Sequence, residues 1–326
     1  MIQMNQTSSP QHTDIAITVA SWEERFRKGM ERLIEAIKPS KVLMFHFKEY
    51  AEWSNDNRKY ISDLCREKSV QIEGDIPLSF DSPLYSWKNL LKHIEMAIVS
   101  GELITLDIST MPREAIWSIF HVLTQRQASI QYIYNKPEKY ADWLSRDPGR
   151  PRLLYRLAGI QHLGRPTALV VQTGYDVERV KQLVRFYEPD KLLLGLQTGE
   201  QFDNAMQNRA KHESAFEKHR NVEMFDVDGY SLDIIQDNFM QVTKPLLVDH
   251  NVILSSLGPK VGALSLFTVK LMLPDVAMSY APSNEYNREY SSGIGESIHG
   301  ILKCGSRMRG DRSSVSSHLD ETIKLA

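Results

Sequence analysis

Cysteine is scarce in this chain, and its scarcity argues against two common kinds of site. The two cysteines, Cys65 and Cys304, lie far apart, whereas zinc sites and disulfide-stapled folds need closely spaced or numerous cysteines. The ten histidines show no ligand spacing with acids or cysteines. We therefore expect no metal site, and the low cysteine usage favours a reducing compartment such as the cytoplasm.

Long apolar runs and a surplus of charge of one sign are also missing. No stretch approaches the roughly 18 apolar residues that a membrane-spanning helix needs, and the polar first residues do not resemble a signal peptide. The net charge of −2 gives no basic surplus for bulk nucleic-acid binding. There is no Walker motif, zinc pattern or serine elbow. These absences predict a cytoplasmic protein without membrane association, bulk nucleic-acid binding or a resident cofactor.

What the chain does contain is one pattern written twice. Residues 107–114 read DISTMPRE, and residues 254–261 read LSSLGPKV. Aligned without a gap, the two segments share a serine, a proline and a basic residue: Ser109 with Ser256, Pro112 with Pro259, and Arg113 with Lys260. Further matches follow in the same order at nearly the same spacing. The pattern indicates internal duplication, which predicts a pseudo-two-fold arrangement with a cleft shared by two related surfaces.

Short apolar strands alternate with amphipathic helices in both halves, which is typical of βαβ units and parallel sheets. The predicted fold class is α/β, with two tandem Rossmann-like units whose sheets are mainly parallel. The predicted division has five parts: a flexible leader (1–13), a first unit (14–148), a linker rich in Pro and Gly (149–166), a second unit (167–296) and a mobile tail (297–326).

The repeated segment falls where ligands bind in such folds. In parallel sheets, ligands lie at the carboxyl ends of strands, against helix N-termini with free N–H groups. The candidates in the two repeated turns are four hydroxyl residues as hydrogen-bond donors and two cations as phosphate partners: Ser109, Thr110, Ser255, Ser256, Arg113 and Lys260. The alternative is that these residues are helix caps followed by solvated cations.

Two similar turns follow the first two strands of the second half. They read QTGY at 172–175 and QTGE at 197–200, and glycine permits close backbone approach to a ligand. The candidates there are Gly174, Thr198 and Gly199. Tyr280, which ends the last strand and matches Tyr134 in the first half, is a candidate to stack on a base or close the cleft. Ordinary turns and aromatic packing are the alternatives.

Residues 254–260, and less closely 107–113, resemble the turn after the fourth strand of CRISPR-associated Rossmann-fold (CARF) sensor domains. That turn has small and hydroxyl residues and ends in a basic residue, often as Gly-Thr-Lys; here Pro259 stands before Lys260. The resemblance implies two paired domains that hold a cyclic oligonucleotide across a two-fold axis and in some cases cleave it slowly.

The sequence therefore predicts a sensor or regulatory protein that binds a nucleotide or another phosphate-bearing small molecule, acts in prokaryotic antiviral defence and signals to a protein effector. Two alternatives stay open. One is an enzyme acting on a nucleotide or sugar phosphate, with Asp107 or Glu114 as acid or base. The other is a protein-binding subunit without a small ligand.

Overall fold

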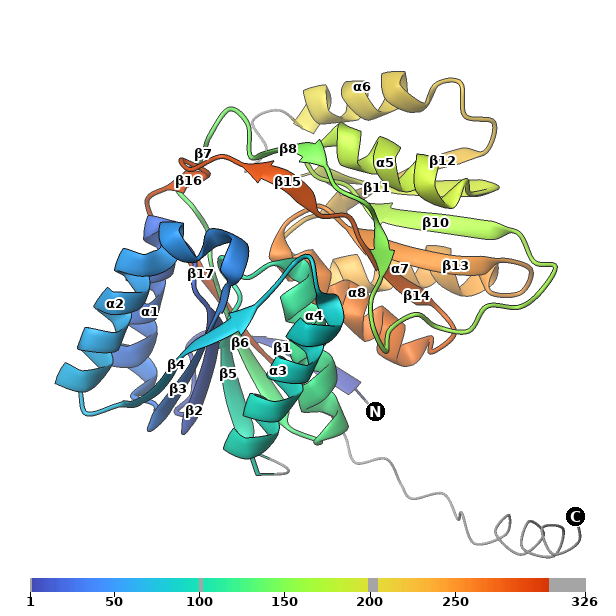
Figure 1. The fold of residues 1–326 in the computed structure, drawn as a ribbon. Helices are drawn as coiled ribbons and strands as arrows, with labels where there is room; N and C mark the ends of the chain where they lie inside the picture. The colour runs from blue at the N-terminus through green and yellow to red at the C-terminus, as the bar shows by residue number, and fades with distance from the viewer. Residues whose placement is uncertain (1, 100–101, 199–204, 305–326) are drawn as a thin grey trace, which may run out of the picture.

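The computed structural model describes residues 2–99, 102–198 and 205–304, which form two α/β units, each built on one sheet (Figure 1). The first sheet has the order β1-β17-β6-β5-β2-β3-β4. Its strands are β1 (Ile2–Thr7), β2 (Ile15–Val19), β3 (Lys41–Phe47), β4 (Gln71–Leu78), β5 (Leu103–Asp107), β6 (Ser129–Asn135) and β17 (Ser297–Cys304). Its helices are α1 (Glu24–Ile37), the 3-10 turn η1 (Lys48–Tyr50), α2 (Ala51–Glu67), α3 (Pro83–Ala97) and α4 (Arg113–Gln125).

The second sheet has the order β12-β11-β10-β13-β14-β9. Its strands are β9 (Arg152–Leu153), β10 (Thr167–Gln172), β11 (Lys191–Thr198), β12 (Val222–Asp228), β13 (Asn251–Ser256) and β14 (Ala277–Tyr280). Its helices are α5 (Val177–Tyr187), α6 (Ala205–Phe216), α7 (Leu232–Leu246) and α8 (Lys260–Met272).

Counted along the chain within each unit, the parallel strands of both sheets follow the order 3-2-1-4-5. This confirms the predicted α/β class with mainly parallel, Rossmann-like sheets. A shared strand order is also what the predicted duplication requires, while the duplication itself stays a prediction.

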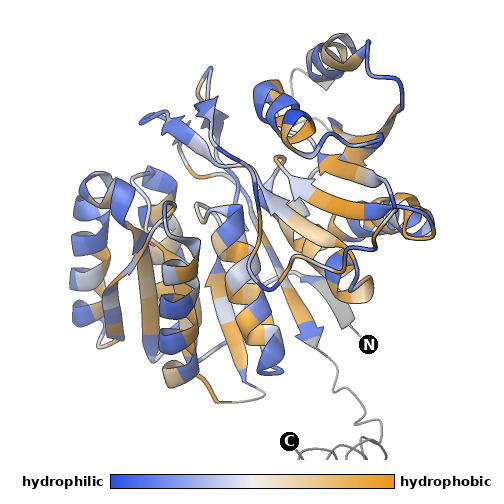
Figure 2. Ribbon diagram, turned by 45° about the vertical axis from the view of Figure 1, so that its right-hand side comes forward, coloured by the Kyte–Doolittle hydropathy of each residue, from blue (hydrophilic) through white to orange (hydrophobic). Residues whose placement is uncertain are grey.

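The local sequence explains the elements. Strands β2 and β13 are buried along their whole length, as expected for central parallel strands covered by helices on both faces. In α1, Phe26, Met30 and Leu33 recur at helical spacing and are buried on one face. Figure 2 shows the same separation across the molecule, with hydrophobic strands inside and hydrophilic helix faces outside.

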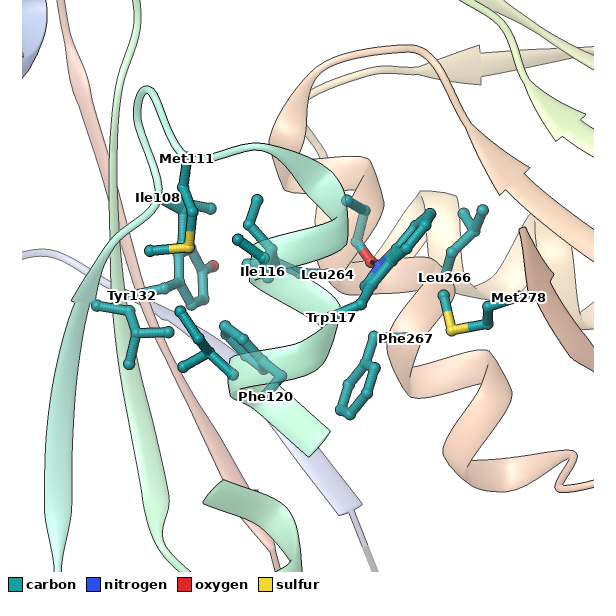
Figure 3. Packing of buried hydrophobic residues seen from close by; sticks show 14 of the residues in the cluster. Ile108, Met111, Ile116, Trp117, Phe120, Tyr132, Leu264, Leu266, Phe267 and Met278 are labelled. Carbon is teal, nitrogen blue, oxygen red and sulfur yellow. Dashed lines mark hydrogen bonds between the residues drawn. The ribbon is translucent and has the colours of Figure 1, made fainter. Parts of the chain in front are cut away.

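The packing forms a layered arrangement around one central core. Helices α1 and α2 cover the outer face of the first sheet, and α5 and α6 cover the outer face of the second. A single hydrophobic cluster joins the inner faces of both sheets through α3, α4, α7 and α8. Figure 3 shows its centre, where Trp117 and Phe120 of α4 face Leu264 and Phe267 of α8. The two units therefore share a core instead of being joined only by a linker.

Two short antiparallel ribbons also join the units (Figure 1). Strand β7 (Lys139–Tyr140) pairs with β16 (Ser291–Ser292), and β8 (Ser145–Pro148) pairs with β15 (Ser283–Tyr286). Each ribbon joins a segment that follows the last parallel strand of the first unit to one that follows the last parallel strand of the second. We call these two ribbons the arms.

The ends of the chain differ from the predicted leader and tail. Within the predicted leader, β1 pairs along β17, and within the predicted tail, β17 pairs along β6, so both extend the first sheet. Burial of Ile298, Ile301 and Leu302 explains why this segment forms strand β17. Within the predicted linker, β9 pairs with β14. Residues 305–326 lie outside the described residues. The prediction of two units separated by a linker remains untested as a division into domains.

Two negative findings apply to the described ranges. No helix in them is long and apolar enough to cross a membrane. They also contain no group of three or more His, Cys, Asp or Glu residues placed to hold a metal ion.

Candidate functional site

Helices α4 and α8 begin next to each other where the two units meet (Figure 1). Each has proline at its N-cap, Pro112 or Pro259, and a basic residue at its first helical position, Arg113 or Lys260. No side chain caps either helix. Unpaired N–H groups and the positive end of the helix dipole favour anions at such a terminus. We call the region around these two helix starts the junction.

The two basic side chains cross the junction in opposite directions. Lys260 Nζ donates to the carbonyl oxygen of Ser109 at 2.7 Å. Arg113 Nη2 donates to the carbonyl oxygen of Leu257 at 3.0 Å and also to that of Gly258. Each unit thus uses its cation to contact the repeated turn of the other unit. The pairing of Arg113 with Lys260, inferred from the sequence, is matched by their reciprocal contacts.

The acceptors at these two cations are neutral carbonyl groups, not carboxylates. Burial lowers the pKa of Lys260 well below its usual value; the positive charges of Arg25 and Arg113 lower it further, while Glu23 and Asp107 oppose the shift. Burial, with repulsion from Arg179, also lowers the pKa of Arg113. The folded protein therefore disfavours the charged forms of Lys260 and Arg113, which are held by backbone carbonyls.

Sequence reasoning missed a third cation at the junction. Arg25 is 1% exposed, forms a 3.0 Å ion pair with Glu23 and donates to the carbonyl oxygen of Asn135. Burial lowers the pKa of Arg25, but Glu23 and nearby tyrosines outweigh burial, and the net shift is upward. Arg25 remains charged. The only sequence signal was an arginine on the otherwise apolar face of a helix.

A second buried acid, besides Glu23, lies beside the cations. Asp107 accepts hydrogen bonds through Oδ1 from the backbone N–H of Ser109 at 2.9 Å and from its hydroxyl at 2.5 Å, while Oδ2 has no partner. Burial raises the pKa of Asp107, against the hydrogen bonds from Ser109 and the charges of Arg25 and Lys260. The sheet register places Ser255 at the corresponding position of β13, so the acid is present in one unit only.

Glu114, the other acid considered as a catalytic group, is paired with a cation. Arg152 of β9 binds it through two hydrogen bonds, Nε to Oε1 at 3.0 Å and Nη2 to Oε2 at 2.6 Å. The pair attaches the connection between the units to α4. In this arrangement, Glu114 is held as a structural carboxylate.

Tyrosines surround the junction. Tyr280 is 3% exposed, and burial raises its pKa well above the usual value. Burial raises the pKa of Tyr290 to about 12 and that of Tyr140 well above the usual value. Both residues belong to the arm formed by β7 and β16, with Tyr140 in β7 and Tyr290 next to β16. The Tyr134 and Tyr140 hydroxyls lie 3.4 Å apart. The phenols of Tyr140, Tyr280 and Tyr290, whose pKa values burial raises, stay neutral at physiological pH and supply polar groups without negative charge.

Most of the predicted hydroxyl donors are engaged within the protein. Ser109 Oγ bonds Asp107 and accepts from the backbone N–H of Asn135. Ser255 donates to the carbonyl of Ser279, and Ser256 donates to Gln172 Oε1. The buried hydroxyl of Thr110 has no partner among the residues that the structure describes. Ligand contacts by these hydroxyls stay predictions.

The predicted turns of the second unit are in place but tightly packed. A Cβ added at Gly174 would clash with the carbonyl oxygen of Leu257, so this glycine lets two turns of the same unit touch. Thr198 ends β11 and is partly buried, and Gly199 lies outside the described residues. The signal that sequence reasoning did not use is the glutamine that opens each turn. The side chains of Gln172 and Gln197 are both buried beside the start of α8.

Comparisons with known proteins found a similarity in fold to a solved structure. No family model matches the chain, and no curated protein matches it. Among solved structures, it is similar to one described as "Structure of a Type III CRISPR defence DNA nuclease activated by cyclic oligoadenylate", with a TM-score of 0.54 and 10% sequence identity. The match covers 78% of this chain and 63% of that chain, so the chain spans less than two thirds of that structure's length. At this identity the likeness supports the fold.

Proposed function

We propose that this protein is a sensor that binds a nucleotide or another phosphate-bearing small molecule at the junction of α4 and α8. The observation that carries the proposal is the reciprocal placement of Arg113 and Lys260. Each is a cation at an uncapped helix start, with backbone carbonyls as its acceptors. An anion between the two helix starts would take over these donors and supply the missing negative charge.

The solved neighbour suggests which anion to test first. It is described as a defence nuclease activated by cyclic oligoadenylate, and a ring of phosphates suits a pseudo-two-fold cluster of cations. By analogy, we propose a role in prokaryotic antiviral defence, in which the bound ligand changes how the protein engages an effector. Because the match covers 63% of the neighbour, neither its nuclease activity nor its partners are transferred to this chain.

A ligand panel tests the proposal. Cyclic tri-, tetra- and hexa-adenylate and ADP are compared with uncharged adenosine by thermal unfolding and calorimetric titration. A ligand at about 100 times its Kd stabilises the folded state by about 2.7 kcal/mol, so at least one phosphate-bearing ligand is expected to raise Tm while adenosine does not. If none binds, the sensor proposal fails and a protein-binding subunit without a small ligand becomes the better account.

The enzyme alternative rests on Asp107. Its raised pKa and its Oδ2, which has no partner among the described residues, are features of a general acid. Unlike Glu23 and Glu114, it has no cation of the described ranges at hydrogen-bond distance. Under the sensor proposal, the tightest-binding nucleotide is recovered intact after prolonged incubation, as followed by chromatography. Repeated turnover that is lost in Asp107→Asn would favour the enzyme.

Binding is expected to weaken as pH rises and to be accompanied by proton uptake. In the free protein the pKa of Lys260 is lowered by burial, and a bound phosphate would raise it. Between the lower pKa of the free state and the higher pKa of the bound state, binding therefore takes up a proton, and affinity falls with increasing pH. Calorimetry of the best ligand in buffers with different ionisation enthalpies measures this uptake.

Asp107 also has a raised pKa, so the same titration in Lys260→Met identifies the group responsible. Loss of the proton uptake in this variant assigns it to Lys260. Unchanged uptake, or affinity that is independent of pH in the wild type, would contradict the account of Lys260. The phenols of Tyr140, Tyr280 and Tyr290 and the guanidinium of Arg25 do not contribute, because the pKa of each is raised above its usual value.

A further inference from the structure

Two glutamine side chains beside the junction have polar atoms that no residue in the described part of the chain satisfies. Gln172 ends β10 and is 0% exposed, and Gln197, near the end of the neighbouring strand β11, is 1% exposed. Gln172 Oε1 accepts from Ser256. Among residues 2–99, 102–198 and 205–304, Gln172 Nε2 has no partner, and neither Nε2 nor Oε1 of Gln197 has one. Unpaired buried polar atoms are destabilising, so their retention at one place points to a ligand.

Both carboxamides lie against glycines in the turns that lead into α7 and α8. A Cβ at position 258 would lie 2.7 Å from Gln197 Nε2, and one at position 229 would clash with Gln197 Oε1. A Cβ at position 262, in the first turn of α8, would clash with Gln172 Nε2. The amide groups are therefore covered by bare backbone, without side chains between them and the start of α8.

The same turn connects the carboxamides to the cations. Arg113 donates to the carbonyl oxygen of Gly258, while Gln197 Nε2 lies on the Cα side of that glycine. A ligand phosphate that replaced the carbonyl at Arg113 would release the turn from its contact with the other unit. The adjacent group of the ligand would then lie next to Gln197.

We infer that Gln197, with Gln172 beside it, forms a subsite that reads the hydrogen-bonding edge of an adenine base, which names the specificity of the nucleotide site proposed above and rests on that proposal. A carboxamide offers one donor and one acceptor side by side, which matches the N7 acceptor and N6 donor of adenine. The unpaired Gln172 Nε2 supplies a further donor. Gly229 and Gly258 allow the covering turns to lie on the amides when no base is bound.

The subsite belongs to one unit only. The strand register shows which residues of the two units occupy equivalent positions. In the first sheet Ile15 pairs with Lys41, and in the second Ala168 pairs with Lys191. At the positions of Gln172 and Gln197 the first unit then has Val19 and Phe47. Phe47 stacks on Phe80 with ring centroids 3.8 Å apart. The first unit thus has no side-chain amide at these two positions. Only the second unit would recognise a base by hydrogen bonds from these positions.

Gln197→Met tests the inference, with Gln241→Met on the exposed face of α7 as the matched control. The probes are cyclic tetra-adenylate and the same ring built from inosine, which has a carbonyl oxygen in place of the N6 amino group. The wild type is expected to prefer the adenylate ring by roughly tenfold or more. Gln197→Met is expected to bind both rings equally, at the weaker affinity. Its Tm without ligand is expected to match that of the control, because no internal hydrogen bond is lost.

The failures are distinguishable. A wild type that binds both rings equally, or a Gln197→Met variant that keeps the preference, overturns the subsite and leaves the phosphate site intact. A Tm for Gln197→Met well below that of Gln241→Met shows that the amide is satisfied inside the protein, which also overturns it. A wild type that binds neither ring contradicts adenylate binding at the junction, and the subsite fails with it.

Discussion

Replacing Trp117 with alanine is expected to lower the free energy of unfolding by about 4 kcal/mol, within the usual range of about 3–5 kcal/mol for loss of a buried tryptophan. Trp117 is 0% exposed and lies between the two units (Figure 3). Its indole Nε1 donates to the carbonyl oxygen of Ala263 in α8 at 2.7 Å. The variant loses both the apolar contacts and this hydrogen bond, and chemical denaturation measures the loss.

Because one hydrophobic cluster spans both units, we expect the wild type to unfold in a single transition and the Trp117 variant to destabilise both halves. Leu163→Ala is the control, since Leu163 is 104% exposed and its loss should change stability by less than about 0.5 kcal/mol. Hydrogen exchange on both sheets separates the outcomes. Faster exchange confined to the first sheet would show that the units do not share their stability.

Lys260→Met and Arg113→Met are each expected to weaken binding of the best phosphate-bearing ligand by roughly 10- to 100-fold. Each variant removes a charge-assisted hydrogen bond, which is worth about 1.5–3 kcal/mol, and a factor of ten in Kd corresponds to about 1.4 kcal/mol. The two cations contact opposite turns of the same junction, so their effects are expected to be coupled instead of additive. Calorimetric titration of both single variants and the double variant measures this.

The same substitutions separate a binding role from a structural one. Burial lowers the pKa of Lys260 because the folded protein disfavours its charge. In the wild type, this group's contribution to stability therefore increases as pH rises from the lowered folded pKa toward the higher unfolded value. Removing the charge should then leave Tm at pH 7 nearly unchanged or slightly raised. Lys88→Met, on the exposed face of α3, is the control for binding and stability.

A large fall in Tm with unchanged affinity would mean that Lys260 and Arg113 only fasten the units together through the carbonyls of Ser109, Leu257 and Gly258. That outcome would contradict the sensor proposal while keeping the fold. Loss of affinity with Tm retained is the result that the proposal requires.

Periodicity in the sequence carries most of the fold. Strands such as β2 and β13 are continuous apolar runs because helices cover both of their faces, and α1 shows its buried face directly in the spacing of Phe26, Met30 and Leu33. Strands β1 and β17 were not predicted because they form by pairing with each other across almost the whole chain. Pairing between segments this far apart in the sequence leaves no local pattern that would identify either strand.

The sequence points to the candidate site only where the two halves repeat each other. The shared Pro-basic pair located Arg113 and Lys260, which contact each other's turns. Arg25 and Gln197 are distinguished by their burial, which composition does not show. Asp107 was considered from the sequence as an acid or base, and the structure adds that it is buried. The ungapped alignment also pairs Asp107 with Leu254, whereas the sheet register places Ser255 at the position of Asp107. The reason is that the first turn, up to the start of α4, is one residue longer than the second, up to the start of α8.

The most direct test of the junction as an anion site is a crystal structure of the complex with the tightest-binding panel ligand, prepared with phosphorothioate groups. Anomalous scattering from sulfur then locates the ligand independently of any fitted atoms. The account predicts sulfur peaks between the first turns of α4 and α8, with Arg113 and Lys260 turned from the backbone carbonyls toward them. Peaks located elsewhere, with both cations still on the carbonyls of Ser109, Leu257 and Gly258, would contradict it.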